Sequence, residues 1–168
     1  FTNPKVQRLR RLLGRRSARS EEGAFVIEGA VLIGEAISAG WELEAEFVAP
    51  GAEPVSHAPL FELADGVLQR VASTDHPQPN LAVARIPTER ALSSHDLVPH
   101  FVVVVDQLND PGNLGTILRS SEAAGVDAVV LTPGSVDPFN PKVVRASAGA
   151  LFHVPVLTAP VDDLRSAG

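Results

Sequence analysis

The feature that most constrains the fold is an unbroken apolar run, Phe101-Val102-Val103-Val104-Val105, which ends at Asp106. A β-branched run with no polar alternation is typical of a strand covered on both faces, as in a parallel sheet. Helical spacing follows from about Leu114 to Ala124, with Gly125 at the position after the helix, and Val126–Leu131 predicts the next strand. The pattern therefore predicts a βαβ unit in an α/β domain.

A further helix and strand are predicted after this unit. Thr132-Pro133-Gly134 is typical of a turn, and Asn140 is placed to cap a helix whose first residue is Pro141. Gly149 is expected to end this helix. A final strand is predicted near Phe152–Leu157.

The first half of the chain predicts a separate small α/β module. After an apolar stretch at 24–27, the predicted elements alternate: a helix from about Gly29 to Gly40, a strand near Leu43–Ala49, a short helix near Leu60–Ala64, and strands near Val67–Ala72 and Leu81–Ile86. The segment 87–99 mixes Pro, Ser, Thr and His between two apolar patterns, which is typical of a domain boundary. We predict domains at 1–88 and 100–168, joined by a linker at 89–99.

Residues 3–18 predict an amphipathic basic helix. Val6, Leu9, Leu12 and Leu13 recur at helical spacing, with arginine on the other faces. The first nineteen residues hold seven basic residues and no acidic one, although the whole chain has a net charge of −6. Such cations repel one another unless a polyanion or an acidic surface neutralises them, so we expect nucleic-acid binding. A solvated surface helix is the alternative.

Composition excludes several kinds of protein. The chain has no cysteine, so it can form neither a disulfide nor a thiolate zinc site, and we predict no metal. No stretch approaches the roughly 18 apolar residues of a membrane span, and no leader opens the chain, so we expect a cytoplasmic protein outside the membrane. Because the chain starts at Phe1, lacks methionine and stops at Gly168 soon after a helical pattern begins, we interpret it as part of a longer protein.

The first segment that indicates chemistry is residues 106–119, between the predicted strand and helix. Ligands of parallel α/β sheets bind at the carboxyl ends of strands. Asn113 and Gly115 are expected at the helix start, where free backbone N–H groups favour an anion. Arg119 lies about 9 Å further along the helix, within reach of the same substrate. Taken singly, Asn113 could be an ordinary helix cap and Arg119 an ordinary surface cation.

The second segment is residues 137–150. Val143 and Ser147 form an i, i+4 pair on one face of the predicted helix, whereas Lys142 and Arg145 share another face. One face can therefore pack while the other meets phosphate.

Together the two segments resemble those of the SpoU/TrmH RNA methyltransferases, in the SPOUT superfamily. The first has the family's aspartate, proline, Asn-x-Gly and helical arginine; the second has its lysine, arginine, serine and Gly-Ala pair. More loosely, Asn3-Pro4-Lys5-Val6 with the arginine-rich helix, and Phe25 to Gly29, resemble the substrate-binding domain that precedes the catalytic domain in many members.

The resemblance implies a small N-terminal α/β RNA-binding domain followed by a parallel-sheet methyltransferase domain of the trefoil-knot type. The third motif, which threads the knot, is expected beyond Gly168. The implied reaction moves a methyl group from S-adenosylmethionine to a ribose 2′-hydroxyl of ribosomal or transfer RNA, in a homodimer. The implied roles are catalysis by Asn113 and Arg119, cofactor binding by Thr132, Gly134 and Ser147, and RNA binding by Lys5, Arg8, Arg11, Arg15 and Arg145.

Arg119 is a poor general base, because the pKa of an arginine lies above about 12. We interpret it as a phosphate clamp that lowers the pKa of the hydroxyl, with a phosphate oxygen or water taking the proton. The histidines are weaker candidates: we expect His57, His76, His95 and His100 on the surface, and His153 in the core of an apolar strand.

Two other functions fit parts of the pattern. A non-catalytic RNA-binding protein could keep this fold, but the presence of Asn113 and Arg119 argues against it. A dinucleotide-binding enzyme would also contain a βαβ unit. The G-x-G-x-x-G fingerprint is absent after Val105, so that function ranks low.

Overall fold

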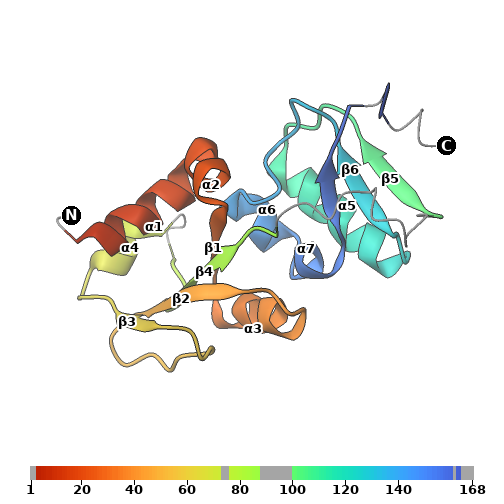
Figure 1. The fold of residues 1–168 in the computed structure, drawn as a ribbon. Coiled ribbons are helices and arrows are strands. Elements are labelled where there is room, and N and C mark those ends of the chain that lie inside the picture. Colours follow the sequence, from red (N-terminus) through yellow and green to blue (C-terminus); the bar gives the residue numbers. More distant parts are fainter. Residues whose placement is uncertain (1–2, 73–75, 88–99, 161, 164–168) are drawn as a thin grey trace. The chain divides into compact units, whose positions relative to one another are not determined.

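The structure is a computed structural model that describes residues 3–72, 76–87, 100–160 and 162–163. The chain divides into two compact units, one of residues 1–87 with 139–141 and one of residues 88–138 with 142–168. Each unit contains its own sheet (Figure 1). The predicted linker at 89–99 lies outside the described residues.

The sheet of the first unit has the strand order β1-β4-β2-β3. Its strands are β1 (Ala24–Glu28), β2 (Leu43–Val48), β3 (Leu60–Glu62) and β4 (Asn80–Arg85). β4 pairs antiparallel with both β1 and β2, whereas β3 adds to the outer side of β2 in parallel.

Helices cover both faces of this sheet. They are α1 (Pro4–Gly14), α2 (Arg16–Glu22), α3 (Ala30–Ser38) and α4 (Val67–Val71). α1 begins where the Asn3 side chain accepts a hydrogen bond from the Lys5 backbone N–H at 2.9 Å, with Pro4 in the first turn. Figure 1 shows α1 and α2 over one face of the sheet and α3 over the other.

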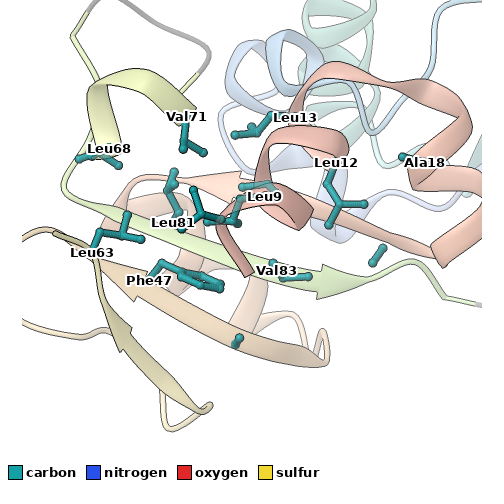
Figure 2. Packing of buried hydrophobic residues seen from close by; sticks show 14 residues of the cluster. Leu9, Leu12, Leu13, Ala18, Phe47, Leu63, Leu68, Val71, Leu81 and Val83 are labelled. Atoms are coloured by element: carbon teal, nitrogen blue, oxygen red, sulfur yellow. The ribbon is translucent and has the colours of Figure 1, made fainter. Parts of the chain in front are cut away.

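The main core of the first unit lies between the sheet and α1. The apolar stripe of α1 packs against inward-facing strand residues and against α4. The residues of this core include Leu9, Leu12, Leu13, Phe47, Leu63, Leu68, Val71, Leu81 and Val83 (Figure 2). On β1, Ala24 and Val26 belong to this cluster, whereas the alternating Phe25 and Ile27 are buried outside it, on the face that α3 covers.

The second unit has a parallel sheet in the order β5-β6-β7. Its elements are β5 (Val102–Val105), α5 (Pro111–Ala123), β6 (Ala128–Leu131), α6 (Pro141–Ala146), α7 (Ala150–His153) and β7 (Val156–Thr158). The predicted βαβ unit and the parallel sheet are confirmed. No helix of the described ranges has the length and apolar character needed to cross a bilayer.

Two short elements of the first unit were predicted wrongly. Residues 60–64 are not a helix, because Leu60–Glu62 pair with β2 as strand β3. Residues 67–72 are not a strand: α4 begins after Gly66, whose φ of 72° turns the chain, and it buries Leu68 and Val71 one helical turn apart.

The basic N-terminal segment is two helices rather than the single predicted one. Arg15 has extended backbone (φ −127°, ψ 122°) between α1 and α2. The break lets α2 change direction and bury Ala18 and Arg19. The stripe of Val6, Leu9, Leu12 and Leu13 predicts one continuous helix and does not indicate this burial.

The predicted strand at 152–157 begins later than expected. Ala150–His153 form the short helix α7, and strand β7 starts only at Val156. Leu151 and Phe152 are buried as helix residues. His153 is therefore an exposed residue at a helix end rather than a core residue of a strand.

Burial on both faces holds for β6 but not for β5. Every residue of β6 is buried, because it lies between two strands and under helices. β5 lies at the edge of the described sheet, and the side chains of Val104 and of Phe101 just before it are 47% and 49% exposed. Apolar continuity therefore predicted the parallel sheet correctly and the burial of its edge strand wrongly.

Candidate active site

Hydrogen bonds tie together the carboxyl ends of β5 and β6. Asp106 follows β5 and Thr132 follows β6. The Thr132 hydroxyl donates to Asp106 Oδ1 at 2.7 Å and accepts from the Gln107 backbone N–H at 2.9 Å. The Thr132 N–H also donates to the carbonyl of Val105 at 3.0 Å. The first residues of the two loops that leave this edge are therefore held together by these hydrogen bonds.

The loop after β5 is held in an unusual backbone conformation. Gln107 has a φ of 48°, which non-glycine residues rarely adopt. The Asn109 side chain donates to the Gln107 carbonyl at 3.2 Å, and the Val136 N–H donates to the Leu108 carbonyl at 2.7 Å. The second of these bonds joins the loops after β5 and β6.

Asp110, not Asn113, caps α5. An Asp110 carboxylate oxygen accepts a hydrogen bond from the Asn113 backbone N–H at 2.7 Å, and Pro111 is the first helical residue. Asn113 is thus the third residue of the helix and its side chain is exposed. The alternative of Asn113 as the helix cap is wrong, and its side chain is left at the protein surface beside the loops of the carboxyl edge.

Arg119 is exposed on the same helix. The buried side of α5 consists of Leu114, Gly115, Leu118 and Ser121. Ideal helix geometry places Arg119 about 9 Å along the axis from Asn113 and about 120° around it. Both predicted catalytic side chains therefore lie on the solvent side of α5, and an extended substrate such as a nucleotide could contact both.

Gly115 lies where α5 meets the end of α6. A Cβ atom on Gly115 would lie 2.4 Å from the Cβ of Ala146 and 2.9 Å from the backbone nitrogen of Ser147. A side chain does not fit at these distances. The glycine of the Asn-x-Gly motif is therefore needed for helix packing, and the anion site at the helix start stays a prediction.

α6 presents one buried face, as its spacing predicted. Val143 and Ser147 are fully buried, whereas Lys142 is exposed and Arg145 is half-buried. The Ser147 hydroxyl donates to the Val144 carbonyl at 2.8 Å. Cofactor contact by Ser147 and RNA contact by Arg145 stay predictions, and the Ser147 residue as a whole, backbone included, has no exposed surface.

The chain turns sharply after α6 and after β6. Ala148 has a φ of 50°, and with Gln107 it makes up the non-glycine residues of positive φ in the described ranges. Strained backbone of this kind clusters at ligand sites. Gly134 is exposed with a φ of 91°, and an added Cβ there would meet nothing within 4 Å. Gly134 therefore allows a backbone conformation that other residues rarely adopt, and the space beside it is open.

The predicted RNA-binding arginines of α1 differ in their surroundings. Arg8 binds Glu22 at 2.6 Å and Glu44 at 2.7 Å, and Arg11 binds Glu22 at 2.9 Å. Partial burial alone would lower the pKa of Arg8, but hydrogen bonds and charge from the two glutamates raise it. Partial burial would likewise raise the pKa of Glu22, but the two arginines lower it. Part of the positive charge is thus neutralised within the chain.

Other basic residues of this segment also have distinct roles. Arg19 is 4% exposed, and its guanidinium donates to the carbonyls of Leu12 at 2.6 Å and Leu13 at 3.4 Å. It satisfies the last turn of α1 and does not face solvent, as a uniform basic face would require. The ammonium of Lys5 lies 4.6 Å from the ring centroid of Phe61, and Arg15 is exposed. RNA contact by Lys5, Arg8, Arg11 and Arg15 stays a prediction.

Histidine and carboxylate side chains form no metal centre in the part of the chain that the structure describes. His57, His76 and His100 are exposed, as predicted, and His95 lies outside the described residues.

Both halves of the chain match known families. Residues 100–167 match the SpoU rRNA Methylase family, and residues 3–82 match the MRM3-like substrate binding domain. The two matches fall on the two units that the sheets define.

Two relatives illustrate the similarity. A 23S rRNA (guanosine(2553)-2′-O)-methyltransferase of Bacillus subtilis is 33% identical over 99% of this chain and 68% of its own length. The mitochondrial rRNA methyltransferase 3 of Mus musculus is 37% identical over 84% of this chain and 37% of its own length. The chain thus spans about two thirds of the bacterial relative and little more than a third of the mouse protein.

Solved structures show the same fold. The SpoU methyltransferase AviRb from Streptomyces viridochromogenes, in complex with AdoMet, superposes with a TM-score of 0.85 at 26% identity, over 99% of this chain and 69% of that one. The AdoMet-bound rRNA methyltransferase from Sinorhizobium meliloti gives a TM-score of 0.85 at 29% identity, over 99% of this chain and 66% of that one.

Proposed function

The chain belongs to the SpoU rRNA methylase family, and from this membership we propose that its protein transfers a methyl group from S-adenosylmethionine to a ribose 2′-hydroxyl of ribosomal RNA. One observation carries the proposal. The exposed Asn113 lies beside the carboxyl edge of a parallel sheet and the exposed Arg119 lies further along the same helix, within the segment that matches the family. Ligands of such sheets bind at this edge.

The residues of the edge fit part of a cofactor site. Gly134 and Ala148 lie in exposed turns that a ligand can reach, whereas Thr132 and Ser147 are buried and their hydroxyls are already engaged. We propose that Gly134 and the backbone near Ser147 border S-adenosylmethionine, with Thr132 positioning the loop. When bound, the cofactor supplies an electrophilic methyl on its sulfonium.

We assign substrate positioning to α5. The Arg119 guanidinium would bind the phosphate next to the target ribose and lower the pKa of its hydroxyl, and the Asn113 amide would orient the sugar. Asn113 and Arg119 point to solvent from a helix whose other side is packed, so both are accessible to RNA. The hydroxyl proton would leave to a phosphate oxygen or to water, since arginine is a poor base.

The two units divide the work in this proposal. The first unit, which matches a substrate-binding domain, holds the RNA, and the second carries the reaction. The boundaries 1–88 and 100–168, with a linker at 89–99, remain our proposal for this division. Ribosomal rather than transfer RNA is the proposed substrate because both relatives described above are named for rRNA.

We also propose that the protein is a homodimer that acts in the cytoplasm. The apolar side chains of Phe101 and Val104, about half exposed at the sheet edge, support a further protein contact. The bacterial relative is named for 23S rRNA, and ribosomes assemble in the bacterial cytoplasm. Light scattering of the intact protein tests the dimer, and a monomer that still methylates RNA would contradict it.

The experiment that tests the function is a map of 2′-O-methylated riboses in the source cell, with and without the gene. We expect one ribosomal RNA position to lose its methyl group and to regain it when the gene is restored. An unchanged map, together with RNA binding by the purified protein, would instead favour a non-catalytic RNA-binding protein.

A further inference from the structure

A basic hollow lies between α1 and α4 of the first unit. Its volume is about 710 Å³, and it is lined by Gln7, Arg10, Arg11, Leu13, Gly14, Arg15, Arg70, Val71 and Ala72. Among the lining residues that the structure describes, four of the nine are arginines and none of the nine is acidic. A second hollow, between the start of α1 and β3, includes both Lys5 and Glu62 and so mixes the two charges. The α1–α4 hollow is therefore the more cationic of the two.

The core holds the walls of this hollow in place. Leu13 of α1 and Val71 of α4 line the hollow and also belong to the apolar cluster beneath it. Figure 2 shows α4 beside α1, with Leu68 and Val71 over the same cluster as Leu9 and Leu13. The arginines of α1 and Arg70 of α4 thus project from two helices whose spacing is set by packing.

The arginines in and just after α1 lie on two different sides of the helix. On the side of the sheet, Arg8 is bound by Glu22 and Glu44, and it does not line the hollow. On the side of α4, Arg10, Arg11 and Arg15 line the hollow with Arg70. Arg11 is shared, since it also binds Glu22, but its side chain is still 51% exposed. Of the exposed cations of α1, Arg10 and Arg11 therefore line this hollow, with Arg15 just after the helix, whereas Lys5 lines the other hollow.

Helix dipoles do not explain the whole set. A cation in the last turn of a helix interacts with the partial negative charge there, typically by about 0.3–1 kcal/mol, and Arg11 and Arg70 occupy such positions. One cation at each helix end would serve this purpose. Four guanidinium groups around one hollow give it a positive surface, although Arg11 also binds Glu22, and such a surface attracts a polyanion.

We propose that this α1–α4 groove binds the phosphate backbone of the RNA, with Arg70 as a contact that the sequence did not reveal. Guanidinium groups bind phosphate oxygens with two parallel hydrogen bonds, so arginines from two neighbouring helices can contact one strand together. The choice of RNA as the polyanion rests on the proposed function. The proposal moves the main phosphate contacts of the first unit from Arg8 to Arg10, Arg15 and Arg70.

The test compares charge removal inside and outside the groove. Arg10→Gln/Arg70→Gln removes one exposed cation from each wall, and Arg85→Gln removes an exposed cation from the sheet, where Arg85 contacts Glu42 and Glu44. Binding of a mixed-sequence RNA stem-loop to the intact protein is measured by filter retention over a range of salt. We expect the slope of log affinity against log salt to flatten by about 0.9 for each phosphate that is no longer neutralised, or nearly two units for the pair, with no change in Arg85→Gln.

A conservative variant separates charge from fold. Arg10→Lys/Arg70→Lys keeps both charges, so it should keep the slope. Circular dichroism should show the same folded spectrum for all variants, with a slightly lower melting temperature in Arg10→Gln/Arg70→Gln, which loses the Arg70 charge at the end of α4. An unchanged slope in Arg10→Gln/Arg70→Gln would overturn the proposal. It would also be overturned if this variant lost binding to polyglutamate but not to RNA, because the groove would then bind an acidic protein.

Failure of the proposed function would look different. If methyl transfer to RNA were absent while the groove variant still had a lower RNA affinity and a flatter slope, the groove would stand as an RNA site and the enzymatic assignment would fall. If methyl transfer were present and the slope unchanged, the enzyme would stand and the groove would not.

Discussion

Gly115 of α5 lies so close to Ala146 of α6 that a Cβ atom on the glycine would be 2.4 Å from the alanine Cβ and 2.6 Å from its carbonyl carbon. The first contact is to the root of a side chain and the second is to backbone, so neither can move aside easily. This approach joins the helix that carries Asn113 and Arg119 to the helix that carries Arg145. The geometry of the candidate site therefore depends on the absence of a side chain at position 115.

Gly115→Ala should destabilise the protein by about 1–3 kcal/mol, as overpacking of a tight contact does, and it should lower methyl transfer by shifting α5. The measurement is urea unfolding followed by circular dichroism. Gly34→Ala is the matched control, because Gly34 lies within α3 and an added Cβ would meet nothing within 4 Å. It should stabilise the protein by about 0.5–1 kcal/mol, and equal effects of the two substitutions would contradict the packing argument.

Thr132→Val should loosen the carboxyl edge without changing the volume of the side chain much. It removes the donor to Asp106 and the acceptor for the Gln107 N–H, at a cost of about 1–3 kcal/mol. Thr132→Ser should restore most of this stability. Thr158→Val, at an exposed position of β7, should change the unfolding free energy by less than about 0.5 kcal/mol. A neutral Thr132→Val would show that the strand ends are held by other contacts.

Long apolar runs predicted the second unit well. The run that ends at Val105 indicated a parallel strand because burial in an α/β sheet leaves no polar alternation. The short elements of the first unit failed for the opposite reason: three residues of β3 and five of α4 show too little periodicity to distinguish strand from helix. Their type is set by pairing with β2 and by Gly66, which are tertiary and backbone effects.

The sequence predicted which residues belong to the candidate site, but not the hydrogen bonds that hold them in place. Asn113 and Arg119 were found because their motif has a recognisable spacing. The bond between Asp106 and Thr132 joins residues 26 positions apart, and no local pattern indicates it. Arg19 is one of the seven basic residues in the first nineteen that were expected to meet a polyanion, because the break at Arg15 that buries it is not visible in the apolar stripe.

Arg19→Ala should destabilise the protein by about 1–3 kcal/mol, because the carbonyls of Leu12 and Leu13 would be left without a buried charged donor. Arg16→Ala, at an exposed position of the same helix, is the comparison and should have little effect on the unfolding free energy. Thermal melts of the two variants decide the matter. Similar melting temperatures would mean that Arg19 does not support the end of α1.

Glu46→Gln should destabilise the first unit at neutral pH but not in acid. Glu46 is fully buried and accepts hydrogen bonds from the Val55 and Ser56 backbone N–H groups and from the side chains of Ser56 and Asn80. Burial alone would raise its pKa, but these hydrogen bonds lower it below the ordinary glutamate value.

The sign of the pH effect follows from linkage. A carboxyl whose pKa is lowered in the folded state stabilises the protein above its unfolded pKa, and this stabilisation is lost as the pH falls through the folded pKa. The difference between wild type and Glu46→Gln should therefore be about 1–3 kcal/mol at pH 7 and shrink in acid. Glu62→Gln, at an exposed position of β3, should show no such trend. A difference that stayed constant down to low pH would contradict the role of the carboxylate.

Arg119→Ala should abolish methyl transfer and leave the affinity for S-adenosylmethionine nearly unchanged. Arg119 is exposed on α5, and the proposed cofactor contacts lie in the loop around Gly134 and the turn after α6, so its removal should affect substrate phosphate and not the cofactor. Arg119 is proposed to bind the phosphate beside the reacting hydroxyl, and loss of one donor that stabilises developing charge typically lowers a rate by about 10²–10³-fold. Arg119→Lys keeps the charge but not the planar guanidinium, so it should retain only part of the activity.

Glu122→Gln, exposed on the same helix as Arg119, controls for the change of a surface charge. Calorimetric titration of the cofactor and a tritium-transfer assay on RNA separate binding from catalysis. Full activity of Arg119→Ala would remove this arginine from the mechanism, and a matching loss of cofactor affinity would place it in the cofactor site instead.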